Sequence, residues 1–104
     1  MFENEQKISK IVMKGTSHNF CPLGNAHYTN HFTIQMEPNK CIPDYLEVER
    51  FIKENINDKK LIIEDAVTIL ADYIYDTFAP RIVTVVSHVT DAAHPEVQVF
   101  TERY

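Results

Sequence analysis

The strongest helical pattern in the sequence is LIIEDAVTILADYIYDTFAP, residues 61–80. Apolar side chains recur there at helical spacing, so that one face of a helix would be continuously apolar. They are Ile63, Ala66, Val67, Leu70 and Ile74. Pro80 disfavours the helical conformation for the residue before it. The stretch therefore predicts an amphipathic helix that ends before Ala79.

A second helix is predicted immediately upstream, over residues 44–56. Asp44, with Glu47 three positions later, resembles a capping box in which Asp takes the Ser or Thr place. Apolar side chains again follow at helical spacing, at Tyr45, Val48, Ile52 and Ile56. Residues 57–60 are predicted to form the turn between the two helices.

Segments of β character flank the helices on both sides. Residues 81–89 are rich in β-branched side chains, and residues 96–102 alternate in polarity. Residues 31–37 alternate cleanly, with Phe32, Ile34 and Met36 on one face. Residues 8–14 are predicted to form a first strand that stops at the Gly-Thr-Ser run of residues 15–17. Residues 17–30 then form a predicted long loop, of a kind that often carries function.

The resulting order, ββααββ, predicts an α+β domain. Strand pairs at both ends of the chain, with consecutive helices between them, favour an antiparallel sheet covered on one face by the two helices. With 104 residues, the chain fits a single domain over residues 1–104. Because so small a domain buries a limited share of its surface, we expect sites that are shared with a partner subunit.

Composition excludes several classes of protein. The chain is 44% hydrophobic and 24% charged, which is ordinary globular usage. Its apolar runs are much shorter than the ~20 residues of a membrane span, and its acidic N-terminus lacks the features of a signal peptide. We therefore expect a cytoplasmic protein with no membrane association and with reduced Cys21 and Cys41. The net charge of −5 disfavours extensive nucleic-acid binding.

Chemically reactive side chains concentrate between residues 18 and 31, at His18, Cys21, His27 and His31. A thiol beside imidazoles can act as a nucleophile. The same four side chains are also potential zinc ligands, and Cys21 can equally be a small buried hydrophobic residue.

Glu64 and Asp65 open the second predicted helix. Negative charge stabilises a helix N-terminus. A carboxylate at this position can also accept two parallel hydrogen bonds from the edge of a heterocycle. The residues alone leave both interpretations open.

Three features together resemble the tunnelling-fold (T-fold) superfamily: the ββααββ order, Phe-Cys-Pro at residues 20–22, and LIIEDAV at residues 61–67. The resemblance is closest to its QueF-like branch and covers residues 8–102. That branch contains the 7-cyano-7-deazaguanine (preQ0) reductase and an archaeal amidinotransferase that acts on the same nitrile in tRNA.

Several properties are implied by this resemblance. Cys21 would be the nucleophile that forms a thioimide with the nitrile, and Glu64 would bind the base. The function would lie in queuosine- or archaeosine-type tRNA modification. The protein would be a homo-oligomer, with the sheets of several subunits closed into a barrel and the sites between subunits.

The chain departs from the family pattern at three places. Tyr28 stands where the family has a proton-donating Asp, and His27 beside it is the expected substitute. Residues 43–47 replace the Glu-Ser-Lys-Ser cofactor motif of the reductases, and Ile63 replaces their His. The resemblance implies NADPH as the cofactor of a reductase and no cofactor for an amidinotransferase; the short length favours the latter.

Two alternatives remain at this stage. Type IB GTP cyclohydrolases share similarity at Cys-Pro, residues 21–22, at Asn-Ala-His, residues 25–27, at Ile-Glu-Asp, residues 63–65, and at Ala-Ala-His, residues 92–94. That similarity implies a pterin or purine hydrolase whose zinc, manganese or iron is bound by Cys21 and His27. The other alternative is a non-catalytic T-fold module that keeps base recognition through Glu64.

Overall fold

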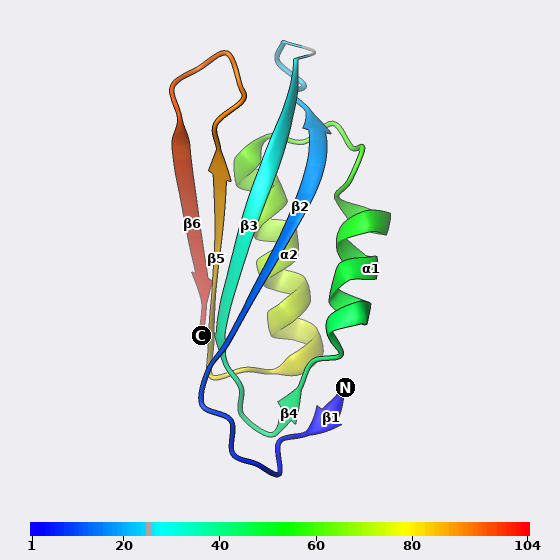
Figure 1. Cartoon of the computed structure of the whole chain (residues 1–104), viewed down its shortest axis with the longest axis vertical. Helices are drawn as coiled ribbons and strands as arrows, with labels where there is room; N and C mark the ends of the chain where they lie inside the picture. The colour runs from blue at the N-terminus through cyan, green and yellow to red at the C-terminus, as the bar shows by residue number, and fades with distance from the viewer. Residues whose placement is uncertain (25) are drawn as a thin grey trace.

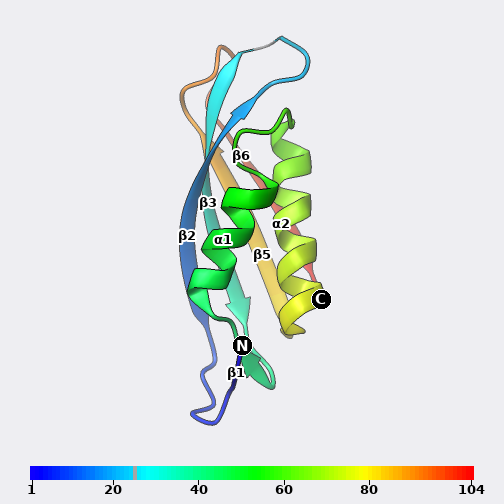
Figure 2. The same cartoon turned by 90° about the vertical axis from the view of Figure 1, so that its right-hand side faces the viewer.

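The computed structural model describes residues 1–24 and 26–104. Its main sheet has four antiparallel strands in the order β2-β3-β5-β6, and α1 and α2 cover one face of that sheet (Figures 1 and 2). The strands are β2 (Ile11–Phe20), β3 (His27–Glu37), β5 (Ile82–Val89) and β6 (Val97–Arg103). The helices are α1 (Tyr45–Asn55) and α2 (Ile63–Phe78), and the short strands β1 (Phe2–Glu3) and β4 (Cys41–Ile42) pair separately. The predicted α+β class and the order of the six main elements are confirmed.

Both helices lie within a residue or two of their predicted bounds. Asp44 is the N-cap of α1, and its carboxylate accepts a hydrogen bond from the backbone N–H of Leu46 at 3.0 Å. Glu47 does not complete the capping box, because its carboxylate instead accepts a hydrogen bond from the hydroxyl of Tyr73 at 3.5 Å. α2 ends where Ala79 adopts the left-handed conformation, φ 45°, directly before Pro80.

The N-cap supports a first prediction on stability. We expect Asp44→Ala to lower the free energy of unfolding by about 0.5–2 kcal/mol, because the N–H of Leu46 loses its acceptor. Urea denaturation followed by circular dichroism measures the change. Asp76→Ala, which removes an exposed carboxylate from the last part of α2, is the control and should change it by less than about 0.5 kcal/mol. Equal losses for the two variants would contradict the capping role.

The predicted long loop over residues 17–30 is wrong. β2 continues to Phe20 and β3 already begins at His27, so the connection comprises only residues 21–26. The polar side chains that suggested a loop include Ser17, Asn19 and Asn30, all of which are buried and hydrogen-bonded to one another. A strand can therefore accommodate them.

The predicted first strand, residues 8–14, is also displaced, because β2 starts at Ile11 and continues through Gly15. A Cβ atom at Gly15 would lie 3.0 Å from Cδ1 of Ile52. This glycine therefore allows α1 to approach the strand closely and does not end it.

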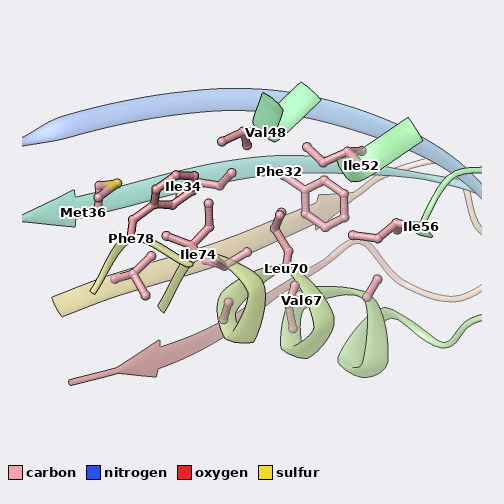
Figure 3. Close-up of a cluster of buried hydrophobic side chains, with 14 of the residues drawn as sticks. Phe32, Ile34, Met36, Val48, Ile52, Ile56, Val67, Leu70, Ile74 and Phe78 are labelled. Carbon is pink, nitrogen blue, oxygen red and sulfur yellow. The ribbon is translucent and has the colours of Figure 1, made fainter. Parts of the chain in front are cut away.

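The hydrophobic core lies between the sheet and the two helices. Figure 3 shows its main side chains, which are Phe32, Ile34 and Met36 of β3, Val48 and Ile52 of α1, Ile56 just after it, and Val67, Leu70, Ile74 and Phe78 of α2. The predicted alternation of β3 is confirmed, since its even-numbered residues from 28 to 36 are buried and its odd-numbered residues face away from the helices. No helix in the described part of the chain has the length and apolar character that crossing a membrane requires.

Candidate active site

The connection between the helices runs along the end of β2. The N–H of Phe20 donates to the carbonyl of Lys59 at 3.2 Å, and the N–H of Leu61 donates back to the carbonyl of Phe20 at 3.1 Å. Phe20 and Lys60 thereby form a short parallel bridge. This pairing brings the start of α2 to the same end of the molecule as the β2–β3 connection (Figure 1). Two regions about 40 residues apart in the sequence meet there.

Cys21 is the first residue after β2 and lies in a tight turn. Its N–H donates to the carbonyl of Ala26 at 2.8 Å, and its carbonyl accepts from the N–H of Gly24 at 3.3 Å. Its side chain is partly buried and packs against a small cluster made of Tyr28, Ile63 and Val89. The thiol therefore lies on the helix-covered side of the sheet, against a cluster that includes the first residue of α2.

Glu64 is the second residue of α2, and its side chain is exposed. No hydrogen bond or ion pair within the described chain involves its carboxylate. The N-cap residue, Ile62, supplies no side-chain acceptor to the first turn, so backbone N–H groups at the start of α2 lack a side-chain partner. The site thus combines a thiol, a carboxylate acceptor and backbone donors within one short region.

Tyr28 of β3 belongs to the buried cluster against which Cys21 packs. Its side chain is only 5% exposed, and its hydroxyl donates a hydrogen bond to the carbonyl of Leu61. Burial raises the pKa of Tyr28, and the nearby groups of Cys21 and Glu64 add to the shift in the same direction. Tyr28 is therefore a neutral hydrogen-bond donor near neutral pH.

His27 does not join Cys21 and Glu64 in this chain. Successive strand residues point to opposite faces of a sheet, so that His27 lies on the uncovered face while Tyr28 points toward the helices. The imidazole of His27 is exposed and stacks at a tilt on Phe20, with ring centroids 4.4 Å apart. The structure places Cys21 and Glu64 at the same end of the molecule, on the helix-covered side, but leaves His27 on the other side of the sheet.

The remaining potential metal ligands are also dispersed. His18 and His31 are exposed on the uncovered face, where the imidazole of His18 lies 3.3 Å from the hydroxyl of Thr29. Over residues 1–24 and 26–104, no group of three or more His, Cys, Asp or Glu side chains is arranged to hold a metal ion. The donor set predicted for zinc is therefore not assembled within one chain.

The stretch that corresponds to the reductases' cofactor motif does not fit NADPH. Asp44 is occupied as the N-cap of α1, and Glu47 accepts a hydrogen bond from Tyr73. Residues 43–47 carry two carboxylates and no cation, whereas phosphate groups are recognised by cationic and N–H donors. They also lie at the far end of α1 from Cys21 (Figure 1). We derive no step that uses this cofactor.

A buried polar network lies behind the site. The amide of Asn19 donates to the carbonyls of Ile56 and Lys59, at 2.7 and 3.0 Å. The amide oxygen of Asn19 accepts from the hydroxyl of Ser17 at 2.6 Å and from the amide of Asn30 at 2.8 Å. The network therefore attaches the α1–α2 connection to β2 and β3.

The network continues to β5, because the hydroxyl of Ser87 donates to the amide oxygen of Asn30 at 2.7 Å. Ser17, Asn19, Asn30 and Ser87 are all at most 1% exposed. Local sequence patterns do not predict these four residues as part of the site. The signal that identifies them is a polar side chain at an inward-facing strand position, and that signal becomes readable only when the bounds of the strands are known.

Comparison with known proteins identifies the fold. No protein-family model and no curated protein matches the sequence. Among solved structures, the chain is similar to the archaeosine synthase QueF-Like in its apo form, with a TM-score of 0.83 and 16% identity over 91% of this chain and 93% of that chain.

This chain has a QueF-like T-fold. The fold predicted from the Cys-Pro turn and the opening of the second helix is thereby confirmed. In the QueF-like fold of this chain, Cys21 directly follows β2 and Glu64 lies in the first turn of α2.

Proposed function

We propose that this protein binds a 7-deazaguanine nitrile of the preQ0 type and attacks it with Cys21, within queuosine- or archaeosine-type tRNA modification. One observation carries the proposal. Cys21 packs against the cluster that contains Ile63, the neighbour of Glu64, in a chain that shares its fold with an archaeosine synthase. A nucleophile just after β2 and a carboxylate acceptor in the first turn of α2 thus lie at the same end of the molecule.

Glu64 supplies recognition in this proposal. The pyrimidinone edge of a guanine-like base presents two parallel N–H donors, and a carboxylate can accept both. Among the described residues no partner competes for this carboxylate, and it is exposed. Because Glu64 is exposed, a bound base needs contacts from a further protein surface. We propose that a neighbouring copy of the chain provides it in a homo-oligomer with sites between subunits.

Two features support such an assembly. β2 and β6 are the edge strands of the main sheet, and an unpaired strand edge is a template for pairing with another chain. Val12 of β2 and Phe100 of β6 are 52% and 62% exposed on the uncovered face. Pairing of β2 with β6 of a neighbour would continue the sheet and cover these apolar side chains.

The proposed reaction begins at the sulfur of Cys21. The thiolate adds to the nitrile carbon, a carbon–sulfur bond forms, and one π-electron pair of the C≡N group moves to nitrogen, which takes up a proton. The product is a covalent thioimide. Ammonia can then add to the same carbon, and cleavage of the carbon–sulfur bond yields an amidine and returns the thiol. This amidinotransferase-type outcome needs no redox cofactor.

The proton for the nitrile nitrogen has no donor in the family position, because Tyr28 replaces the family's Asp. The imidazole of His27 faces away from Cys21 within one chain. The proton therefore comes from water or from a residue of a neighbouring copy. In this proposal the protein acts in the cytoplasm with tRNA as a partner, and its net charge of −5 limits it to local phosphate contacts.

Incubation with 7-cyano-7-deazaguanine, followed by intact-mass measurement, tests the proposal. We expect a mass increase equal to the whole base, because addition to a nitrile releases no leaving group. The matched control is 7-deazaguanine, which lacks the nitrile and should bind without a stable adduct. Absence of an adduct over the pH range in which the protein stays folded would contradict the proposed chemistry.

Glu64→Gln tests recognition separately from chemistry. Hydrogen bonds to a charged acceptor contribute about 1.5–3 kcal/mol, and loss of one such contact weakens binding about tenfold or more. We expect this loss of affinity for 7-deazaguanine in isothermal titration calorimetry. Asp65→Asn, an equal change of charge at the adjacent exposed position, should alter the affinity by less than about threefold. A larger loss of affinity for Asp65→Asn than for Glu64→Gln would contradict the assignment of base recognition to Glu64.

A non-catalytic binding module is the second candidate. The observation that favours it is Tyr28, whose hydroxyl is already bonded to the carbonyl of Leu61 and occupies the place of the family's proton donor. Such a module would bind 7-cyano-7-deazaguanine through Glu64, form no adduct, and keep its affinity in Cys21→Ser.

A further inference from the structure

We propose that Tyr28 is a positioning residue, which holds the start of α2 so that Glu64 meets the base at the correct distance from Cys21. This inference rests on the proposed function and concerns a residue that departs from the family pattern.

Leu61 is held from two strands at once. Its N–H donates to the carbonyl of Phe20, in β2, at 3.1 Å. Its carbonyl accepts the hydroxyl of Tyr28, in β3. These two bonds fix the peptide units on both sides of Leu61, two residues before α2 begins.

No side-chain cap from the described residues holds the start of α2. Ile62, the N-cap residue, offers no side-chain hydrogen bond to the first turn. Glu64 has no partner of its own in the described part of the chain. The direction of its carboxylate therefore depends on the backbone that precedes it, and that backbone is anchored at Leu61.

Tyr28 also contacts the other half of the site. Its ring belongs to the cluster with Ile63 and Val89 against which Cys21 packs. The ring of Tyr28 is thus part of the cluster against which the nucleophile packs, and its hydroxyl holds the peptide that leads to Glu64. Because two parallel hydrogen bonds demand accurate placement of both groups, a shift of this peptide would weaken recognition.

Tyr28→Phe separates the two contacts, because phenylalanine keeps the ring and loses only the hydroxyl. We expect the Kd for 7-deazaguanine to rise by about fivefold or more, measured by calorimetry. Alkylation of Cys21 by iodoacetamide should change in rate by less than about twofold, since the ring remains in the cluster against which Cys21 packs. Tyr75→Phe, which removes a hydroxyl from a half-buried tyrosine of α2, is the control and should leave both values unchanged.

A double-mutant cycle with Glu64→Gln shows whether Tyr28 acts through Glu64. We expect Tyr28→Phe to change the Kd by less than about twofold when Glu64 is already replaced. An equal loss of affinity in both backgrounds would overturn the positioning role, as would an unchanged Kd for Tyr28→Phe alone.

Hydrogen exchange distinguishes failure of this inference from failure of the proposed function. Tyr28→Phe should speed exchange of the amides of Leu61 and Ala66, which donate to the carbonyls of Phe20 and Ile62, without any base present, whereas Tyr75→Phe should not. If the wild-type protein fails to bind 7-deazaguanine, the proposed function is wrong. Unchanged exchange at Leu61 and Ala66 refutes the positioning role by itself, including the case in which Glu64→Gln binds too weakly to complete the cycle.

Discussion

Cys21→Ala is expected to abolish the covalent adduct with 7-cyano-7-deazaguanine completely. The thiolate is the only group in the proposed site that can add to a nitrile carbon, and alanine has no nucleophilic atom. The side chain is partly buried at the edge of a small cluster, so the variant should still fold. Binding of the base should persist, because recognition by Glu64 does not involve the sulfur.

Intact-mass measurement and calorimetry on the same preparation check both statements. Cys41→Ala is the matched control: Cys41 is also partly buried, but it lies in β4, with its sulfur 2.9 Å from the carbonyl of Phe78, at the other end of the molecule (Figure 1). The Cys41→Ala protein should form the adduct at the wild-type rate. An adduct that survives Cys21→Ala, or disappears in Cys41→Ala, would refute the assignment of the nucleophile.

Asn30→Ala is expected to cause the largest loss of stability among the variants considered, about 2–4 kcal/mol. The amide of Asn30 donates to Asn19 and accepts from Ser87, and all three side chains are buried. Alanine leaves the hydroxyl of Ser87 without its acceptor and the oxygen of Asn19 with one donor fewer. A buried polar group without a partner costs about 1–3 kcal/mol.

Urea denaturation measures this loss as a lower midpoint at an unchanged slope. Asn55→Ala removes a comparable amide from an exposed position in α1, where it donates only to the carbonyl of Phe51. That variant should change the free energy of unfolding by less than about 0.5 kcal/mol. Similar losses for the two variants would mean that the buried network does not stabilise the fold more than an exposed hydrogen bond does.

The helices were predictable because their signals are local. Apolar spacing in α2 and the Asp44 cap of α1 each involve residues within a few turns of one another, and local periodicity determines which face of a helix is apolar. The alternation of β3 was predictable from residue 31 onward for the same reason. Residues 17–20 and 27–30 lie in strands, and a loop is predicted there because Asn, which is depleted in strands, occurs in both stretches.

The buried asparagines show why that local signal failed. Asn19 and Asn30 are tolerated inside β2 and β3 because each is hydrogen-bonded to a partner from another element. Those partners lie up to 57 positions away in the sequence. No window of neighbouring residues contains the information that these polar groups are satisfied.

The candidate site likewise has some features that follow from local sequence and others that depend on contacts between distant elements. The Cys-Pro connection, the carboxylate that opens the second helix and the ββααββ order can all be predicted from local patterns in the chain. Three features depend on the tertiary structure: Cys21 packs against the cluster that contains Ile63, Tyr28 bonds to Leu61, and His27 points to the opposite face. The physical reason is the alternation of strand side chains: moving the start of β3 from residue 31 to residue 27 makes His27 and Tyr28 strand residues, and strand geometry then sends adjacent side chains to opposite faces of the sheet.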